Sequence, residues 1–193
     1  DALNKAENEN WVWHGASCLK PANERCLIAL SRGGSDSDVT REFDIKVKAW
    51  VKDGFFRPEA KGALSWIDQD HVFATTDFGK GTMTESGYAR EVRRWRRGTP
   101  MSDAKMVFEV GVEDVLASAT HDFTPGFARN FVIRVEDFYN VEVFLLDDQG
   151  KRHKVDAPKT SQATVHREWL LVQLRKPWTT RGKTWPTGSL IVT

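Results

Sequence analysis

The sequence contains one near-match to the motif that carries the nucleophile of an α/β-hydrolase. Such an enzyme needs Gly-x-Ser-x-Gly at a sharp turn between a strand and a helix, because that turn exposes the serine hydroxyl. The nearest stretch is Gly15-Ala16-Ser17-Cys18-Leu19, which has leucine in place of the second glycine. A Ser-His-Asp triad is recognised by geometry, and no local pattern marks one. We therefore predict no catalytic residue in this chain.

The usual patterns of metal and phosphate chemistry are also missing from the sequence. It has neither a paired-cysteine spacing for zinc nor His-Glu-x-x-His. Neither of the familiar glycine-rich phosphate loops occurs. We predict no metal and no cofactor.

Three of the five histidines recur at similar places in the strand pattern described below. His14, His121 and His166 each fall near the first strand of a different group of strands. In the expected architecture, first strands line a central channel. We interpret the three as polar channel-lining residues in water, and a shared metal site is the alternative.

Residues 90–97, Arg-Glu-Val-Arg-Arg-Trp-Arg-Arg, form the strongest charge feature. Basic residues around an aromatic ring can grip nucleic acid. On a strand, however, they divide between two faces, and the net charge of the whole chain is only +1. We favour an ion-paired strand and predict no nucleic-acid partner. The preceding segment 77–89 contains three glycines and is expected to be the most mobile internal loop, with Phe78 and Tyr88 pinning its ends.

The composition is that of an ordinary globular domain, with 40% hydrophobic and 28% charged residues. No apolar stretch approaches the roughly 20 residues of a membrane-spanning helix, so we predict no membrane partner. The first residues lack the apolar run of a secretory signal, and the absence of an initiator Met predicts that the natural start is missing. Two cysteines, Cys18 and Cys26, are too few for a disulfide scaffold. We expect buried free thiols rather than a hairpin disulfide, and a cytoplasmic protein.

Short apolar runs separated by turn residues predict an all-β fold. Expected strands are Cys26–Ser31, Val39–Ile45, Ala63–Ile67, His71–Thr76, Phe131–Val135, Val141–Leu146, Lys151–Val155 and Trp169–Leu174. Helical periodicity is confined to Ala2–Glu7.

The strands recur in groups of about four, beginning near Trp13, Ala63, Val115 and Ala163, roughly 50 residues apart. This spacing is typical of β-propeller blades. We predict a partial β-propeller domain over residues 1–193, with blades at 11–57, 62–110, 114–156 and 162–193, the last lacking its outer strand.

A series of stretches, in order along the chain, resembles a bacterial branch of the prolyl oligopeptidase family. They are Asn10-Trp-Val-Trp-His-Gly15, Leu30-Ser-Arg-Gly-Gly-Ser-Asp36, Arg41-Glu-Phe-Asp44, Asp53-Gly-Phe-Phe-Arg-Pro-Glu-Ala-Lys61, Thr76-Asp-Phe-Gly79, Ser86-Gly-Tyr88, Trp95-Arg-Arg-Gly-Thr-Pro100 and Val165-His-Arg-Glu-Trp169. Each stretch alone is a weak signal, and together they are specific.

The resemblance implies an arc of a seven-bladed propeller that belongs to a serine peptidase. In that family an α/β-hydrolase domain carries the Ser-His-Asp triad, and the propeller gates access of short peptides to it. The chain matches only propeller sequence, so no triad residue is assigned here. A propeller-type protein-binding or scaffold module without peptidase activity is the alternative.

The resemblance also suggests two substrate contacts. Phe73 matches a family aromatic in the second strand of a blade, and His121 follows an inner strand of the next blade. A third candidate contact, Arg90, follows from its place beside the long loop at 77–89 and not from the resemblance. For Phe73, the alternative to substrate contact is packing between blades. For His121, the alternative is an ordinary turn position. For Arg90, the alternative is that the neighbouring segment is a plain surface loop.

An arc of nearly four blades is expected to leave two terminal faces uncovered and the edge of the strand at 188–192 unpaired. Exposed apolar faces and strand edges attract partners. We therefore expect a homodimer in which two arcs meet end to end. A monomer that covers its own ends is the alternative.

Overall fold

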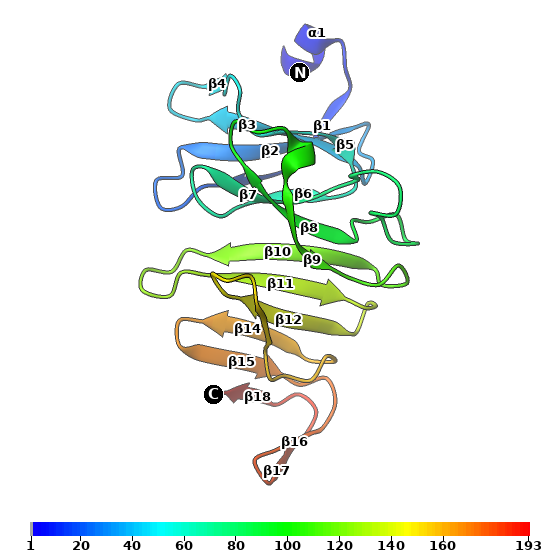
Figure 1. Ribbon diagram of the computed structural model, residues 1–193, viewed down its shortest axis with the longest axis vertical. Helices are drawn as coiled ribbons and strands as arrows, with labels where there is room; N and C mark the ends of the chain where they lie inside the picture. Colours follow the sequence, from blue (N-terminus) through cyan, green and yellow to red (C-terminus); the bar gives the residue numbers. More distant parts are fainter. Residues whose placement is uncertain (1) are drawn as a thin grey trace.

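The computed structural model describes residues 2–193, which form antiparallel β-sheets stacked along the long axis of the molecule (Figure 1). A short helix, α1 (Ala2–Glu7), lies at one end of the stack beside the N-terminus. The C-terminus lies toward the other end, so the sheets form an open arc. The all-β prediction and the short helix are both confirmed.

Four sheets follow the order of the sequence. The first contains β1 (Trp11–Cys18), β2 (Arg25–Arg32), β3 (Asp38–Asp44), β4 (Ala49–Trp50) and β5 (Phe56–Ala60). The second contains β6 (Ala63–Trp66), β7 (His71–Thr75), β8 (Glu91–Arg96) and β9 (Lys105–Glu109), with a 3-10 turn at Met101–Asp103. The third contains β10 (Leu116–Asp122), β11 (Arg129–Val135), β12 (Val141–Leu146) and β13 (Arg152–Lys154). The fourth contains β14 (Gln162–His166), β15 (Trp169–Gln173) and β18 (Leu190–Val192).

The second and third sheets are four-stranded meanders, as predicted, in which each strand pairs with the next along the chain. The first sheet differs, because β3 pairs with β4 near Phe43 and with β5 between Asp38 and Arg41. Two short strands therefore share one edge of β3, and this sheet has five strands where about four were predicted. The chain turns immediately after β3, where the Asp44 carboxylate accepts backbone N–H bonds from Lys46 and Val47.

The fourth sheet carries a hairpin that the sequence analysis did not predict. Strands β16 (Trp178–Thr180) and β17 (Lys183–Trp185) lie between β15 and β18 in the chain and project beyond the fourth sheet (Figure 1). Their two-residue turn places Arg181 and Gly182 at φ of 50° and 73°. Two positive φ angles are typical of the tight hairpin turn that matches the twist of paired strands.

Apolar side chains fill the spaces between successive sheets. Between the first and second sheets, Phe55 packs edge-on against Trp66 and Trp95, with ring centroids 5.7 and 5.0 Å apart. Between the second and third sheets, the core includes Phe108 and the fully buried Val92 and Val132. A blade has two apolar faces, and stacking buries both of them.

The two ends of the stack are partly covered by elements of the chain itself. At one end, Leu3 of α1 packs against a cluster that contains Trp11 and Val39 of the first sheet. Arg41 donates two hydrogen bonds to Glu7, of 2.6 and 2.8 Å, and these lower the pKa of the Glu7 carboxyl. At the other end, the β16–β17 hairpin places two tryptophans, Trp178 and Trp185, against the fourth sheet.

A disulfide joins Cys18 and Cys26, which stand opposite each other on β1 and β2. The prediction of buried free thiols was therefore wrong. The sequence shows only that eight positions separate the two cysteines, whereas the register of the hairpin brings their Cα atoms to 4.0 Å. No helix within residues 2–193 combines the length and apolar character needed to cross a membrane.

Loss of this disulfide is expected to destabilise the chain. Closing a loop of eight residues restricts the unfolded chain by an amount that corresponds to about 2.5 kcal/mol. Cys18→Ser/Cys26→Ser should therefore melt at a lower temperature than the parent chain, and a dithiol reductant should lower the melting temperature of the parent alone. Two free thiols per chain before any reductant is added would contradict the assignment.

Candidate functional site

The first strands of successive sheets form one continuous wall. Strand β6 lies beside β1 on one side and β10 on the other. His14, His121 and His166 lie on β1, β10 and β14, so the predicted placement on three first strands is confirmed. Within residues 2–193, no three side chains of histidine, cysteine, aspartate or glutamate come together as a metal site.

A cavity of about 290 Å³ lies on this wall and is lined by residues from the first three sheets and their loops. His14, Asp38, Tyr88 and Ser118 are among the side chains that line it. The Nδ1 atom of His14 is 2.9 Å from Oδ2 of Asp38. The lining thus includes an imidazole, the carboxylates of Asp36 and Asp38, and residues with hydroxyl groups.

Arg57 of β5 holds the Asp38 carboxylate from behind. Its guanidinium is fully buried and donates hydrogen bonds to Asp38, to the Thr40 hydroxyl at 3.1 Å and to the Ala60 carbonyl at 2.9 Å. Burial lowers the pKa of Arg57, and the nearby charge of Asp38 opposes that shift. The charge of Asp38 is therefore balanced inside the protein and not by solvent.

Phe73, the first predicted substrate contact, is 2% exposed and belongs to the core between the second and third sheets. This position fits packing between blades, which is the alternative to substrate contact. The substrate contact itself stays a prediction.

Arg90, the second predicted contact, is hydrogen-bonded and ion-paired within the chain. It donates hydrogen bonds to the carbonyls of Val110 and Gly81, both at 2.8 Å, and pairs with Glu109 at 2.5 Å. These partners tie the end of the long loop to β9.

His121, the third predicted contact, lies near the end of β10. Its Nδ1 is 2.8 Å from the Asn130 amide oxygen, and its ring meets that of Phe123 edge-on at 4.5 Å. The adjacent Asp122 has a lowered pKa: burial raises it, but hydrogen bonds from Thr124 and Arg129 outweigh that effect. His121 also lines a mainly apolar groove of about 230 Å³ between the third and fourth sheets.

The structure does not bring the three predicted contacts together. The backbone N–H of Ala117 bonds to the carbonyl of Ala89, which places Arg90 beside the start of β10. His121 lies near the other end of that strand, about 15 Å away at the usual rise per residue. Phe73 is buried in a core cluster that also contains Ala117 and Ala119 of β10.

The loop at 77–89 is held by polar contacts as well as by the two aromatic residues singled out in the sequence. Arg93 lies 4.0 Å above the Phe78 ring and Lys61 lies 4.9 Å from the Tyr88 ring, so both ends are pinned as expected. Between them, Thr82 and Thr84 are buried and hydrogen-bonded. The mobility of this loop stays a prediction.

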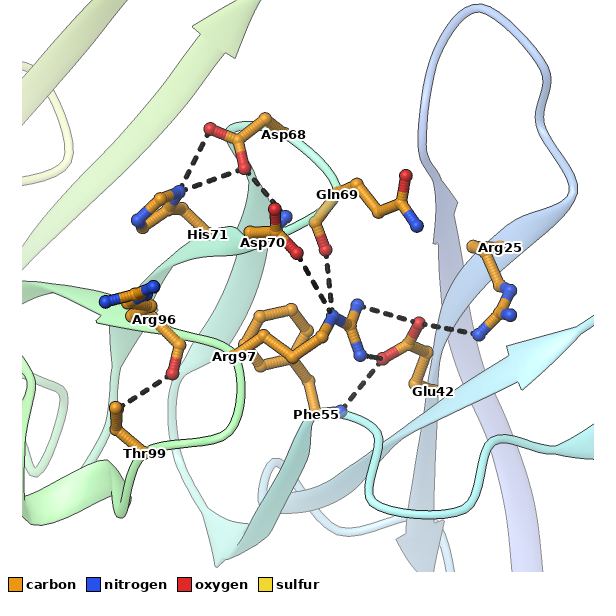
Figure 2. A network of polar contacts seen from close by, with 10 residues as sticks. All are labelled: Arg25, Glu42, Phe55, Asp68, Gln69, Asp70, His71, Arg96, Arg97 and Thr99. Carbon is orange, nitrogen blue, oxygen red and sulfur yellow. Dashed lines mark hydrogen bonds and ion pairs between the residues drawn. The ribbon is translucent and has the colours of Figure 1, made fainter.

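Figure 2 shows the ionic network between the first two sheets, which is centred on the fully buried carboxylate of Glu42. Arg97 donates two hydrogen bonds to it, of 2.8 and 3.0 Å, and the Phe55 backbone N–H donates a third at 2.9 Å. Arg97 also stacks on the Phe55 ring at 4.4 Å and bonds the Gln69 carbonyl at 3.0 Å. The arginine-rich strand is thus ion-paired through Arg97 and through Arg93, which binds Glu91.

Sequence analysis missed Asp38, Glu42 and Arg57. On β3, Asp38, Thr40 and Glu42 alternate with Val39, Arg41 and Phe43. Such a polar face is normally read as solvent-exposed. The only signal against that reading is the number of arginines that follow on neighbouring strands, and their pairing is not visible in the sequence.

A comparison with known families matches residues 1–167 to the prolyl oligopeptidase N-terminal β-propeller domain. The chain belongs to this family. It therefore forms part of a β-propeller, as predicted.

Relatives of this propeller chain are peptidases by name. It is 34% identical over 198 residues to an uncharacterized peptidase, y4nA, from Sinorhizobium fredii, covering 99% of the chain and 27% of the relative. It is 29% identical over 208 residues to the uncharacterized peptidase RP174 from Rickettsia prowazekii, covering 99% and 28%. The chain thus spans less than a third of the length of these relatives.

Solved structures agree with this assignment. A post-proline cleaving enzyme from Rickettsia typhi superposes with a TM-score of 0.91 at 28% identity, covering 100% of this chain and 30% of that enzyme. Oligopeptidase B from Trypanosoma brucei superposes with a TM-score of 0.64 at 15% identity, covering 100% of this chain and 26% of that enzyme. This similarity supports the fold alone.

Removing the Arg97 side chain is expected to destabilise the propeller chain strongly. Arg97→Ala leaves the buried Glu42 carboxylate with only the Phe55 N–H and a 3.4 Å contact to Arg25. Removing one partner of a buried ion pair typically costs about 3–5 kcal/mol. Arg96→Ala is the matched control, because Arg96 is exposed and its side chain has no hydrogen bond in the part of the chain that the structure describes. Its effect should stay within about 0.5 kcal/mol. Equal denaturant midpoints for the two variants would contradict the role of the network.

Proposed function

We propose that this chain is the non-catalytic propeller portion of a prolyl oligopeptidase-like serine peptidase. A Ser-His-Asp active site on an α/β-hydrolase domain, outside this chain, performs the cleavage. The propeller gates that site and admits short peptides. The observation that carries the proposal is the family match over residues 1–167 together with a sequence that contains no Gly-x-Ser-x-Gly.

The packing between sheets supports a gating role. A channel selects peptides by size only if its wall keeps its width, and a wall of separate blades keeps its width only if the blades stay docked. The aromatic core around Phe55 and the Glu42–Arg97 pair dock the first two sheets. The substrates proposed for the whole protein are short peptides. Cleavage after proline is proposed from the similarity to the post-proline cleaving enzyme of Rickettsia typhi.

The isolated chain is expected to show no turnover of a proline-containing chromogenic peptide. Acyl transfer needs an activated serine and its base, and the sequence contains no motif that would supply them. Turnover that co-purified with the chain and survived a serine-directed inhibitor would refute the proposal. In the longer polypeptide, Arg97→Ala should raise the cleavage rate of a long unfolded substrate relative to that of a short peptide, whereas Arg96→Ala should leave this ratio unchanged.

A protein-binding or scaffold role is the second candidate, and one surface feature favours it. Phe138 and Tyr139 are 89% and 70% exposed at the turn between β11 and β12. The Asp137 carboxylate accepts hydrogen bonds from the Tyr139 and Asn140 backbones and so fixes this turn. A downstream reading frame without a hydrolase domain would favour the scaffold role, and one with such a domain would favour the peptidase.

The location proposed for this peptidase is the cytoplasm. Two cysteines in 193 residues are far from the density of a secreted disulfide scaffold. Structural disulfides such as Cys18–Cys26 are rare in reducing compartments. Thiol labelling before and after lysis under denaturing conditions tests whether the bond exists in the cell.

We also propose that the 193-residue chain self-associates. Strand β18 has no partner on its outer edge within residues 2–193, and its Leu190 and Val192 are 60% and 53% exposed. A free edge with apolar side chains invites pairing with a second copy. Helix α1 and the β16–β17 hairpin cover part of the two end faces, which supports the alternative of a monomer.

Light scattering at micromolar concentration is expected to show a dimer of the 21.9 kDa chain. Replacing Leu190 with lysine adds charge to the free edge and should shift the population toward monomer. A chain that stays monomeric on concentration would refute the self-association.

A further inference from the structure

An irregularity in β1 places His14 on the cavity of about 290 Å³ described above. Along β1, Trp13 pairs with Leu30 and Gly15 pairs with Ala29, so His14 is an extra residue in a β-bulge. Bulges turn a side chain away from the regular alternation and are common beside functional sites. The bulge places His14 on the cavity and against Asp38.

A second irregularity lies in the pairing of β3 with β5, beside the contact between Asp38 and Arg57. Asp38 pairs with Ala60 and Thr40 pairs with Arg57, so β5 has one more residue than β3 over this interval. Proline is tolerated at such positions, and Pro58 lies in this interval. The extra residue lets the Arg57 guanidinium reach the Asp38 carboxylate. Two separate departures from regular strand geometry thus assemble one chain of contacts, from Arg57 through Asp38 to His14.

The charges around the cavity identify the kind of ligand. Asp38 is paired with the buried Arg57, and Asp36, the other carboxylate of the lining, is paired with Lys61 at 3.6 Å. Lys61 also lies 4.9 Å from the ring of Tyr88. Both acidic groups of the lining therefore have a basic partner, and protonation of His14 adds one positive charge that no further group offsets.

The hydrogen-bonding groups agree with the charges. His14 is bonded to Asp38 through Nδ1, and within residues 2–193 its Nε2 has no hydrogen-bond partner. The side chain is 42% exposed. When protonated, Nε2 becomes a donor, and the hydroxyl groups of Ser118 and Tyr88 on the same cavity are further donors. A set of donors with a single unbalanced positive charge suits a carboxylate.

Taking the peptide as ligand from the proposed function, we propose that this cavity binds a carboxylate group of a peptide, and that the positive charge of a protonated His14 attracts it. Histidine side chains generally change charge between about pH 5 and pH 8, where peptide carboxylates stay ionised. The titratable and charged groups that face His14 are Asp38 and, around the same cavity, Asp36, Tyr88, Lys61 and Arg57. Asp36 and Asp38 each have a basic partner, so His14 is the group whose charge the proposal invokes. The site is separate from peptide cleavage, and its test needs no turnover.

The test is a titration of the chain with N-acetyl-alanyl-proline, followed through the backbone amide signals of Gly62, Ala63 and Ser118. The ligand control is N-acetyl-alanyl-prolinamide, in which an amide replaces the C-terminal carboxylate. Binding of the acid should be at least about fivefold weaker at pH 8.5 than at pH 5.5, because His14 loses its charge. The amide should bind more weakly than the acid at pH 5.5. N-acetylglutamate methylamide, in a third arm, shows whether a side-chain carboxylate binds as well as a C-terminal one.

Two variants at His14 separate charge from shape. His14→Gln should bind the acid at pH 5.5 as weakly as the parent does at pH 8.5. His14→Lys, which stays charged, should bind the acid equally at both pH values. His166→Gln is the matched control, because His166 lies on the first strand of another sheet and outside this cavity. Equal affinity of the parent chain at both pH values, equal binding of acid and amide, or parent-like binding by His14→Gln would each overturn the proposal.

Discussion

Buried carboxylates on β3 hold the first sheet in place, and the arrangement of the rest depends on them. Asp38, Thr40 and Glu42 form a polar stripe that is 5%, 3% and 2% exposed. A charge at that depth persists only if it is paired and hydrogen-bonded. Arg57 supplies the pairing from within the first sheet, and Arg97 supplies it from the second. Because an unpaired partner is costly, we infer that this stripe fixes one docked position of the two sheets, which a purely apolar surface would define less sharply.

Apolar packing then completes what the ionic contacts position. Phe55 lies at the meeting point, where its ring contacts Trp66, Trp95 and the Arg97 guanidinium. The core of the next junction consists of aliphatic and phenyl side chains, with a backbone bond from Ala117 to Ala89 beside it. The junction between the third and fourth sheets keeps an apolar groove beside His121. The junctions therefore differ in the side chains that form their cores, with ionic and aromatic contacts at the first and mainly apolar contacts at the later ones.

Most charged side chains in the sheet junctions of this chain are engaged by other residues. Its buried charges are balanced in pairs, which suits structure and leaves few groups free to act on a substrate. Arg90 and Phe73 illustrate the point, since one is committed to backbone carbonyls and Glu109, and the other is buried between sheets. His14 is the exception, because a strand bulge presents it to a cavity while its carboxylate partner is already neutralised.

The sequence alone determined the class of fold and the family. Alternating apolar runs with a repeat of about 50 residues indicated propeller blades, and the motifs from Asn10 to Trp169 indicated the prolyl oligopeptidase family. Strand alternation is a local property, so it survives in the sequence. Tertiary structure decided the rest: the Cys18–Cys26 bond, the split outer strand of the first sheet, the bulge at His14 and the burial of Asp38 and Glu42. These features depend on register and on partners far away in the chain. A polar face on a strand looks solvent-exposed until the arginine that covers it, here Arg97 at 55 positions from Glu42, is folded onto it.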